Sequence, residues 1–217
     1  YIMRIKAALQ ALGIDTNQLI IKLVQFATLY RGDERLAMST RSGSFITLRE
    51  LFDEIGQDAC RFFYVTRKPE QHMNFDLTIA KSTTKNNPVY YIQYAHARIC
   101  SVLSKAENAN IGIKANKFET LKHPNEMAVV KKLAEWPRLL ELAAKHNEPH
   151  RLAFYLYELA GDFHALWNMG KEAPETRFFQ ENNPNVSSEK LAMVSAVKLT
   201  IAAGLTILGV TPIDEMR

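Results

Sequence analysis

A short polar loop, residues 38–43, carries the residue types that bind phosphate. It reads Met38-Ser39-Thr40-Arg41-Ser42-Gly43. Phosphate oxygens accept hydrogen bonds from hydroxyls, backbone N–H groups and cations, and a glycine lets the backbone approach closely. The loop supplies all of these groups. Surface turns have a similar composition, so the loop taken alone favours a turn over a nucleotide site.

The segment before this loop predicts a helix followed by strand structure. Apolar residues recur at helical spacing over residues 2–12, and Gly13 follows as a typical helix end. Residues 19–30 are rich in apolar and β-compatible types, and residues 31–34 contain turn-forming Gly and Asp. We therefore expect a strand and a hairpin leading into the loop.

The segment after the loop predicts two short helices. Thr47 followed by Glu50 fits a capping box, so a helix should run over residues 48–55. Asp58 is the expected cap of a second helix, over residues 59–66.

The chain from Asn87 onward has the pattern of an antiparallel helical bundle. Asn87 is the expected N-cap, with Pro88 at the first helical position, where its missing N–H costs nothing. Four to five helices joined by loops satisfy bundle packing. The expected helices cover residues 88–105, 126–135, 137–146 and 149–169, with a final helix capped by Ser187 or Ser188 and ended by Gly209 and Pro212.

Composition limits the class of protein. With 217 residues, 47% of them apolar, the chain can bury a core, and its net charge of +4 is only mildly basic. Cys60 and Cys100 lie far apart without a C-x-x-C or His-rich neighbourhood, which predicts neither a zinc site nor a disulfide framework. No uninterrupted apolar run is long enough to span a bilayer, so we expect a reduced, cytoplasmic protein without a membrane role.

Longer motifs resemble the arginyl-tRNA synthetases, a class I synthetase family. The loop matches Met, Ser and Arg of the class signature K-M-S-K-R, whereas Ala37 and Thr40 replace its lysines. The form M-S-T-R-x-G is typical of arginyl enzymes, and the resemblance covers essentially the whole chain. The further matching segments are residues 58–63, 74–77, 87–98, 149–152, 162–168 and 208–212.

This resemblance implies a mainly α fold in two parts. Residues 1–84 would be the truncated C-terminal end of a Rossmann-like α/β catalytic domain, and residues 85–217 a helical anticodon-binding domain. The chain lacks the H-I-G-H element of the family and starts at Tyr1. We therefore expect the C-terminal part of a longer enzyme, which alone would be inactive.

The resemblance also implies an activity, the attachment of arginine to tRNA-Arg with ATP. Ser39, Thr40 and Arg41 would then be catalytic, because they would stabilise charge on the ATP phosphates as pyrophosphate leaves. Met38 and Gly43 would join them in binding ATP, with Mg²⁺ expected alongside the nucleotide. We expect no structural metal, and a monomer whose partners are tRNA-Arg, ATP and arginine.

The helical part would bind the tRNA anticodon through aromatic and cationic side chains. Tyr94 and Arg98 lie four residues apart and share a helix face, although core packing of Tyr94 is an equal alternative. Phe163 sits centrally on an apolar face, which favours a core position, and Trp167 lies nearer its edge. The residues that match the RNA-contacting region of the family are Gln93, Tyr94, Arg98, Phe163, Trp167 and Met216.

Two alternatives stay open. The chain could be a non-catalytic RNA-binding module, or a helical protein-interaction domain whose aromatic residues all belong to the core.

Overall fold

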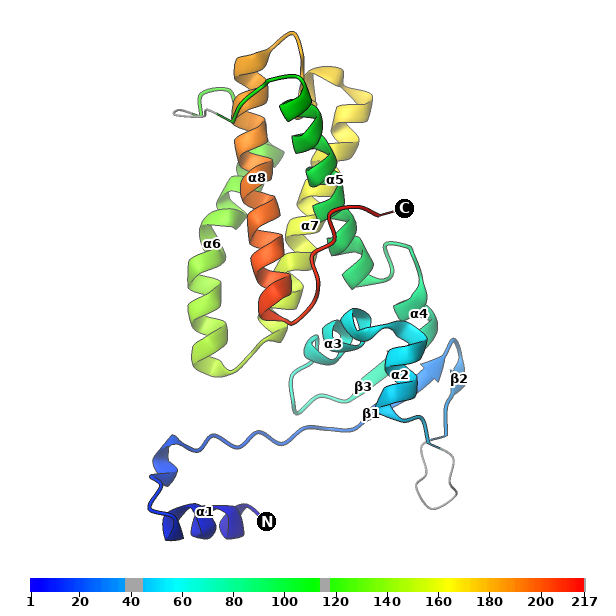
Figure 1. Cartoon of the computed structure of the whole chain (residues 1–217), viewed down its shortest axis with the longest axis vertical. Helices are drawn as coiled ribbons and strands as arrows, with labels where there is room; N and C mark the ends of the chain where they lie inside the picture. Colours follow the sequence, from blue (N-terminus) through cyan, green and yellow to red (C-terminus); the bar gives the residue numbers. More distant parts are fainter. Residues whose placement is uncertain (38–44, 114–117, 217) are drawn as a thin grey trace.

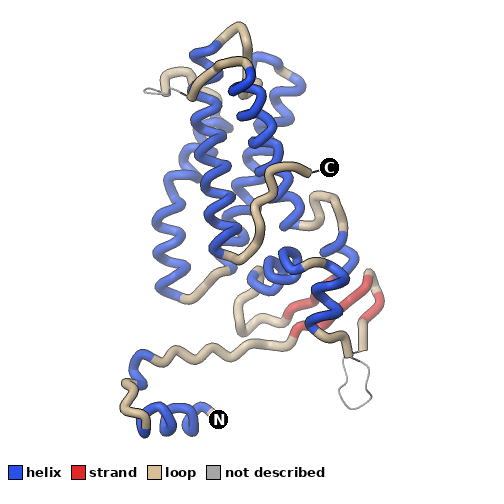
Figure 2. Tube along the Cα trace, in the orientation of Figure 1, coloured by secondary structure: helices blue, strands red, loops and turns tan. Residues whose placement is uncertain are grey.

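The computed structural model describes residues 1–37, 45–113 and 118–216. A small α/β unit lies at one end of a long helical bundle, and an N-terminal helix extends away from both (Figure 1). Figure 2 shows that the described strands lie in the small unit, whereas the described part of the bundle consists of helices joined by loops.

The small unit is built on a three-stranded sheet with strand order β2-β1-β3. Strands β1 (Ala27–Arg31) and β2 (Glu34–Arg35) form the expected hairpin, in which Tyr30 lies opposite Arg35. Strand β3 (Met73–Asp76) pairs parallel to β1. Because parallel strands need a crossover, the chain between β1 and β3 carries helices that cover the sheet.

Three short helices complete this unit: α2 (Leu48–Ile55), α3 (Gln57–Val65) and α4 (Leu77–Lys81). The capping box at Thr47 is confirmed, since its side chain accepts from the Glu50 N–H and Glu50 binds the Thr47 N–H. Leu29, Leu51 and Phe75 are the centre of a separate small core.

Three expectations for this unit need correction. The expected strand over residues 19–30 is regular only from Ala27, because the preceding residues pair with no strand in the described part of the chain. Gly56, not Asp58, is the N-cap of α3. The Asp58 carboxylate instead accepts hydrogen bonds from Gln93 and Thr211, far along the chain. Strand β3 and helix α4 were not expected as elements.

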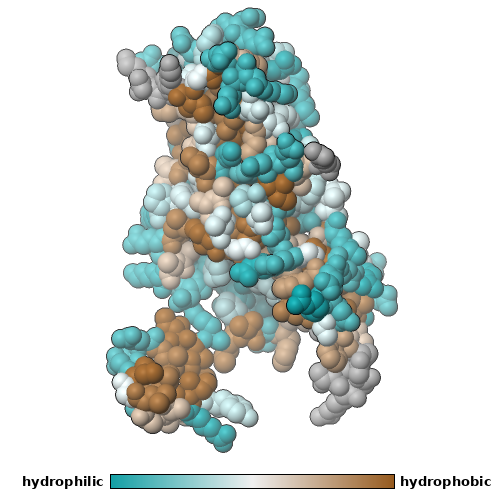
Figure 3. All heavy atoms as spheres, viewed as in Figure 1, coloured by the Kyte–Doolittle hydropathy of each residue, from teal (hydrophilic) through white to brown (hydrophobic). Residues whose placement is uncertain are grey.

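Before the sheet, the chain forms the expected N-terminal helix α1 (Ile2–Ala11), and Gly13 follows with φ +74°. A 3₁₀ turn, η1 (Thr16–Gln18), comes next. Brown, apolar spheres gather over the α1 region at the lower left of Figure 3. The exposed large apolar side chains of this segment include Met3, Leu12, Leu23, Val24 and Phe26.

The bundle consists of four long helices: α5 (Pro88–Asn108), α6 (Pro124–His146), α7 (His150–Glu172) and α8 (Pro184–Ile207), with a 3₁₀ turn η2 (Pro174–Thr176) after α7. Helix α7 contacts the other three. The main core lies between them and includes fully buried Ile92, Ile99, Leu156, Leu159, Leu191 and Ile201. This confirms the mainly helical bundle expected from the sequence.

Helix ends follow the expected caps at Asn87, whose side chain accepts from the Tyr90 N–H, but differ elsewhere. Helix α6 runs through Pro137 as one helix, where two helices were expected. Pro137 is exposed, so its ring points away from the core that holds the helix together. Helix α7 also continues beyond Gly170 to Glu172.

The cap expected at Ser187 or Ser188 is wrong, because α8 begins at Pro184 after Asn183. Ser187 is fully buried inside the first turns of α8. Its hydroxyl donates to the Gln180 carbonyl at 2.9 Å and accepts from the Gln180 N–H at 2.8 Å. This serine therefore holds the loop before α8 against the helix.

Helix α8 is also long and apolar enough, by length and composition alone, to cross a membrane. Core helices of soluble proteins pass the same test. Here Leu191, Val194 and Leu205 are buried against the other bundle helices, which accounts for the apolar character of α8.

The C-terminal tail, residues 208–216, turns back along α5 after Gly209, where φ is +69° (Figure 1). The Gln93 side chain donates to the Thr211 carbonyl at 2.9 Å, and the Thr211 N–H donates to the Asp58 carboxylate at 3.1 Å. His96 Nδ1 lies 3.0 Å from the Ile213 carbonyl. The tail therefore fastens α3 of the small unit to α5 of the bundle.

Candidate nucleic-acid interface

The guanidinium of Arg98 is the centre of an aromatic cluster formed by α5 and α7. Its Cζ lies 4.0 Å from the ring centre of Tyr94 and 5.0 Å from that of Trp167. One guanidinium nitrogen donates to the Tyr94 hydroxyl at 2.7 Å, and the other lies 3.2 Å from His164 Nδ1. The sequence places Tyr94 and Arg98 one helical turn apart, which brings ring and cation together.

His164 orients this cluster from α7. Its Nε2 lies 3.2 Å from the Tyr91 carbonyl, so the neutral ring donates there and presents Nδ1 as an acceptor to Arg98. Burial lowers the pKa of His164 to about 4. The positive charge of Arg98 lowers this pKa further, whereas the hydrogen bond to the Tyr91 carbonyl raises it. The ring is therefore neutral at physiological pH and can hold the guanidinium in place.

The aromatic row continues along α5 to Tyr90. Its ring stacks on Tyr94, with ring centres 5.8 Å apart and an angle of 21° between the planes. Both tyrosines are half-buried, so part of each ring reaches solvent. Such a row offers flat faces on which unpaired bases can stack.

A pocket of about 310 Å³ opens beside Trp167, between α5, α7 and the turn that follows α7. Its apolar wall includes Phe178 and Phe179. The cationic side chains that line it are those of Lys105, Lys171 and Arg177. Cations beside aromatic rings match the phosphates and bases of single-stranded RNA.

The structure brings together three of the predicted RNA-binding residues, namely Tyr94, Arg98 and Trp167. Trp167 is half-buried, and its Nε1 has no hydrogen-bond partner among the residues that the structure describes. Tyr94 is therefore compatible with both alternatives, core packing and RNA contact. Its ring packs on the bundle and also borders the surface.

The other predicted residues lie elsewhere. Gln93 is buried and its amide is used by Asp58 and Thr211, so its position joins the tail to the bundle. Phe163 is 1% exposed and stacks on Phe178 with ring centres 5.6 Å apart, as the periodicity of its apolar face predicted. Met216 lies half-buried at the end of the tail. Their roles in RNA binding stay predictions.

The loop predicted to bind phosphate lies outside the described residues. This includes Met38, Ser39, Thr40, Arg41 and Gly43, so the predicted ATP and Mg²⁺ contacts stay predictions. The division of the chain near residue 85 falls just before α5 and likewise stays a prediction.

Sequence reasoning missed the cations of the pocket and the role of His164. Lys105 could have been found, because it continues the spacing of Tyr90, Tyr94 and Arg98 along one face of α5. Lys171 and Arg177 come from the end of α7 and the turn after it, where no periodicity marks a shared surface.

Comparisons with known proteins show which family the chain resembles. Residues 92–216 match the family described as DALR anticodon binding domain. The arginine–tRNA ligase of Ruegeria pomeroyi is 49% identical over 222 residues, an alignment that covers 100% of this chain and 38% of the relative. That of Nitrosomonas europaea is 48% identical, with 100% and 36% covered. This chain thus spans little more than a third of their length.

Solved structures lead to the same group. A Campylobacter jejuni protein described as an arginyl-tRNA synthetase superposes with a TM-score of 0.79 at 29% identity, covering 100% of this chain and 45% of its own. The arginyl-tRNA synthetase of Thermus thermophilus gives a TM-score of 0.58 at 26% identity, with 82% of this chain and 29% of its own covered.

Proposed function

Because this chain belongs to the DALR anticodon-binding domain family, we propose that it binds the anticodon arm of tRNA-Arg as the C-terminal part of an arginine–tRNA ligase. The observation that carries this proposal is the Arg98 cluster, in which a cation lies between Tyr94 and Trp167 next to a cationic pocket. Stacking on rings and contacts to phosphates are the two requirements of single-stranded RNA binding.

The cluster acts by position. His164 accepts a hydrogen bond from Arg98, and Arg98 donates one to the Tyr94 hydroxyl. These bonds order the side chains in the RNA-free chain. Preordered side chains lose less conformational entropy on binding. Lys105 and Lys171 add charge at the pocket without being part of this arrangement.

The proposal for the whole protein follows from its relatives. In the longer protein, the loop with Ser39, Thr40 and Arg41 would stabilise the ATP phosphates during arginine activation, and Met38 and Gly43 would help to bind ATP with Mg²⁺. Arginine would then be transferred to the bound tRNA-Arg in the cytoplasm, by a monomer. The chain described here would hold the RNA and would not aminoacylate alone.

Binding of the 217-residue chain to tRNA-Arg transcripts tests the RNA-binding part. Affinity should fall steeply with salt, and substitution of the anticodon bases should weaken it. The double variant Lys105→Ala with Lys171→Ala should make the salt dependence shallower by about 1 to 2 in log–log slope, since each lost phosphate contact removes about 0.7 for single strands.

Lys131→Ala is the matched control, because this exposed lysine lies on α6 and does not line the pocket. It should leave both affinity and salt dependence unchanged. Salt-independent or undetectable binding would contradict the proposal and favour a helical protein-interaction domain. Equal effects of the double variant and the control would place the RNA on another face.

A further inference from the structure

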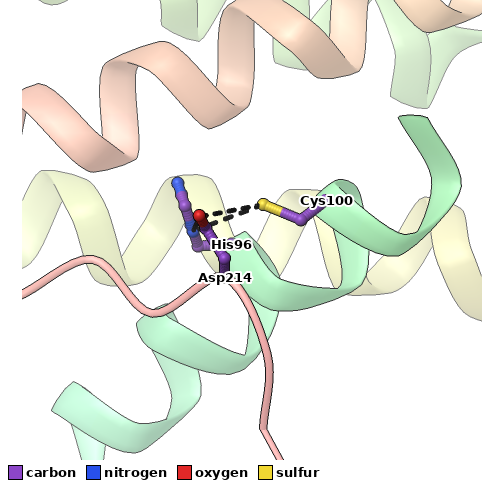
Figure 4. A group of neighbouring side chains, drawn as sticks. All are labelled: His96, Cys100 and Asp214. Carbon is purple, nitrogen blue, oxygen red and sulfur yellow. Dashed lines mark hydrogen bonds and ion pairs between the residues drawn. The ribbon is translucent and has the colours of Figure 1, made fainter. Parts of the chain in front are cut away.

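Three side chains that can bind a metal ion meet where the C-terminal tail crosses α5 (Figure 4). His96 and Cys100 are one turn apart on α5, and Asp214 comes from the tail. Cys100 Sγ lies 3.3 Å from Asp214 Oδ1 and 3.7 Å from His96 Nδ1. His96 Nδ1 lies 3.6 Å from Asp214 Oδ1.

These separations fit a tetrahedral zinc site. With Zn–S near 2.3 Å and Zn–N or Zn–O near 2.0–2.1 Å, tetrahedral angles place sulfur about 3.6 Å from nitrogen or oxygen, and nitrogen about 3.4 Å from oxygen. The three measured distances lie within about 0.3 Å of these values. The ligand atoms would therefore need little movement to bind the ion.

We propose that His96 Nδ1, Cys100 Sγ and Asp214 Oδ1 bind one Zn²⁺ ion that fastens the C-terminal tail to α5. The Asp214 side chain is 75% exposed, so solvent reaches the site and water can supply a fourth ligand. A thiolate, an imidazole and a carboxylate form a donor set that suits zinc better than the hard ions Mg²⁺ and Ca²⁺. This site is independent of the proposed function.

Metal binding exchanges a proton for the ion. Without metal, the Cys100 thiol donates to Asp214 Oδ1, and burial together with this hydrogen bond raises the pKa of the thiol. Zn²⁺ binds the thiolate, and one proton leaves to solvent. Lys198 of α8 also faces the thiol, and its positive charge favours the thiolate while it opposes the cation.

The histidine must also present its lone pair. His96 Nδ1 now lies 3.0 Å from the Ile213 carbonyl, and metal binding requires the ring proton to move to Nε2. Nε2 is buried and has no hydrogen-bond partner within the described part of the chain. The metal bond thus replaces the hydrogen bond to the Ile213 carbonyl and must also offset the cost of a buried Nε2–H that has no acceptor among the described residues.

The sequence did not predict this site, because its third ligand is 114 residues away from Cys100. The spacing of His96 and Cys100, four residues apart on a helix, is the only signal that the sequence offers for it. The site places a metal next to the tail that carries Met216, so it would also fix where the end of the chain lies.

Titration of the chain with Zn²⁺, followed by calorimetry, tests the site. We expect one ion per chain and an affinity that rises with pH, because a proton is released. Co²⁺ in the same site should give the sulfur-to-metal charge-transfer absorption of a thiolate ligand. Hydrogen exchange at residues 211–216 should slow when Zn²⁺ is added.

Cys100→Ser and Asp214→Asn should each weaken Zn²⁺ binding. For Cys100→Ser we expect a loss of more than about 100-fold in affinity, since even residues that only hydrogen-bond to a metal ligand change metal affinity by about 10- to 100-fold. His72→Gln is the control, because this exposed histidine lies outside the cluster. If Zn²⁺ does not bind, or binds equally well to Cys100→Ser, the three side chains form only a hydrogen-bonded cluster and the proposal is wrong.

Discussion

At the scale of single residues, the candidate interface depends on the neutral state of His164. A protonated ring would have no acceptor for Arg98 and would place two positive charges 3.2 Å apart. Burial already holds the pKa of His164 down at about 4. Acid therefore protonates His164 and removes the hydrogen bond by which it holds Arg98.

The first prediction concerns this histidine and pH. Because the folded pKa lies below the ordinary value of 6.5, the unfolded chain binds the proton first, and stability is lost as pH falls from about 6.5 towards 4. Between pH 7 and pH 5 this group should lower the free energy of unfolding by about 2 kcal/mol. Urea unfolding of the chain and of His164→Gln at both pH values measures the difference.

Other groups also titrate in this range, which is why the comparison with the variant is needed. Lys81 lowers the pKa of Glu54, and Arg151 lowers the pKa of Glu148. The stability that these two carboxylates contribute is therefore lost in acid in both proteins. The loss specific to the histidine is the part absent from His164→Gln. Identical pH dependence in the two proteins would show that His164 titrates normally in the folded chain.

The sequence could predict residues whose role is local, but not those whose partners are distant. The period of its own helix favours a core position for Phe163, although the family resemblance places it among the RNA-binding residues, and the residue three places on predicts the cap at Thr47. Asp58 was misread as a cap, because its partners Gln93 and Thr211 are 35 and 153 positions away. No pattern within one segment reveals such pairs.

At the scale of elements, the packing of α7 on α8 depends on a glycine. A Cβ added to Gly204 would lie 2.7 and 2.8 Å from the two methyl groups of Leu156, which is itself fully buried. Leu156 has no free space to move into, because cores are close-packed. Gly204 thus sets the distance at which the two helices meet.

The second prediction compares two glycines in helices. Gly204→Ala should lower the free energy of unfolding by about 1–3 kcal/mol through overpacking. Gly161→Ala on α7 should instead raise it by about 0.5–1 kcal/mol, because alanine favours the helix and the nearest atom, the Tyr91 hydroxyl, is 3.9 Å away. Denaturant unfolding of both variants measures this. Stabilisation by Gly204→Ala would mean that α7 and α8 can separate at little cost.

Like single residues, helix boundaries could be predicted only where the local sequence determines them. Helix α6 was expected to break at Pro137, since proline interrupts helical hydrogen bonding. Packing of its apolar side against α7 and α8 outweighs this local cost. Strand β3 was missed because four residues with two buried side chains carry little periodic signal on their own.

At the scale of the whole molecule, two cores meet at one contact region. The bundle core and the small core of the α/β unit share Ile55, which packs against both. Arg61 of α3 also joins the units, because it donates to the Leu208 carbonyl and lies against Gly209, where a Cβ would come within 2.5 Å of it. Ala59 and Phe62 of α3 are themselves buried in the bundle core, so the tail adds polar bonds to an apolar contact between the two units.

The third prediction tests this link through Asp58. Its carboxylate accepts from the Thr211 N–H at 3.1 Å and from the Gln93 amide at 3.2 Å, and Gln93 is buried. Asp58→Ala leaves these donors without this acceptor, which should cost about 1–3 kcal/mol of unfolding free energy. It should also speed hydrogen exchange at Thr211, because the Thr211 N–H loses its acceptor on α3.

Asp53→Ala is the matched control, since this exposed aspartate lies on the neighbouring helix α2. It should change the free energy of unfolding by less than about 0.5 kcal/mol. Asp58→Asn keeps one carboxamide oxygen as acceptor and should fall between the two. If Asp58→Ala behaves like the control in both stability and exchange, the Asp58 hydrogen bonds do not hold the tail, and α3 is joined to the tail and the bundle through Arg61 and apolar contacts.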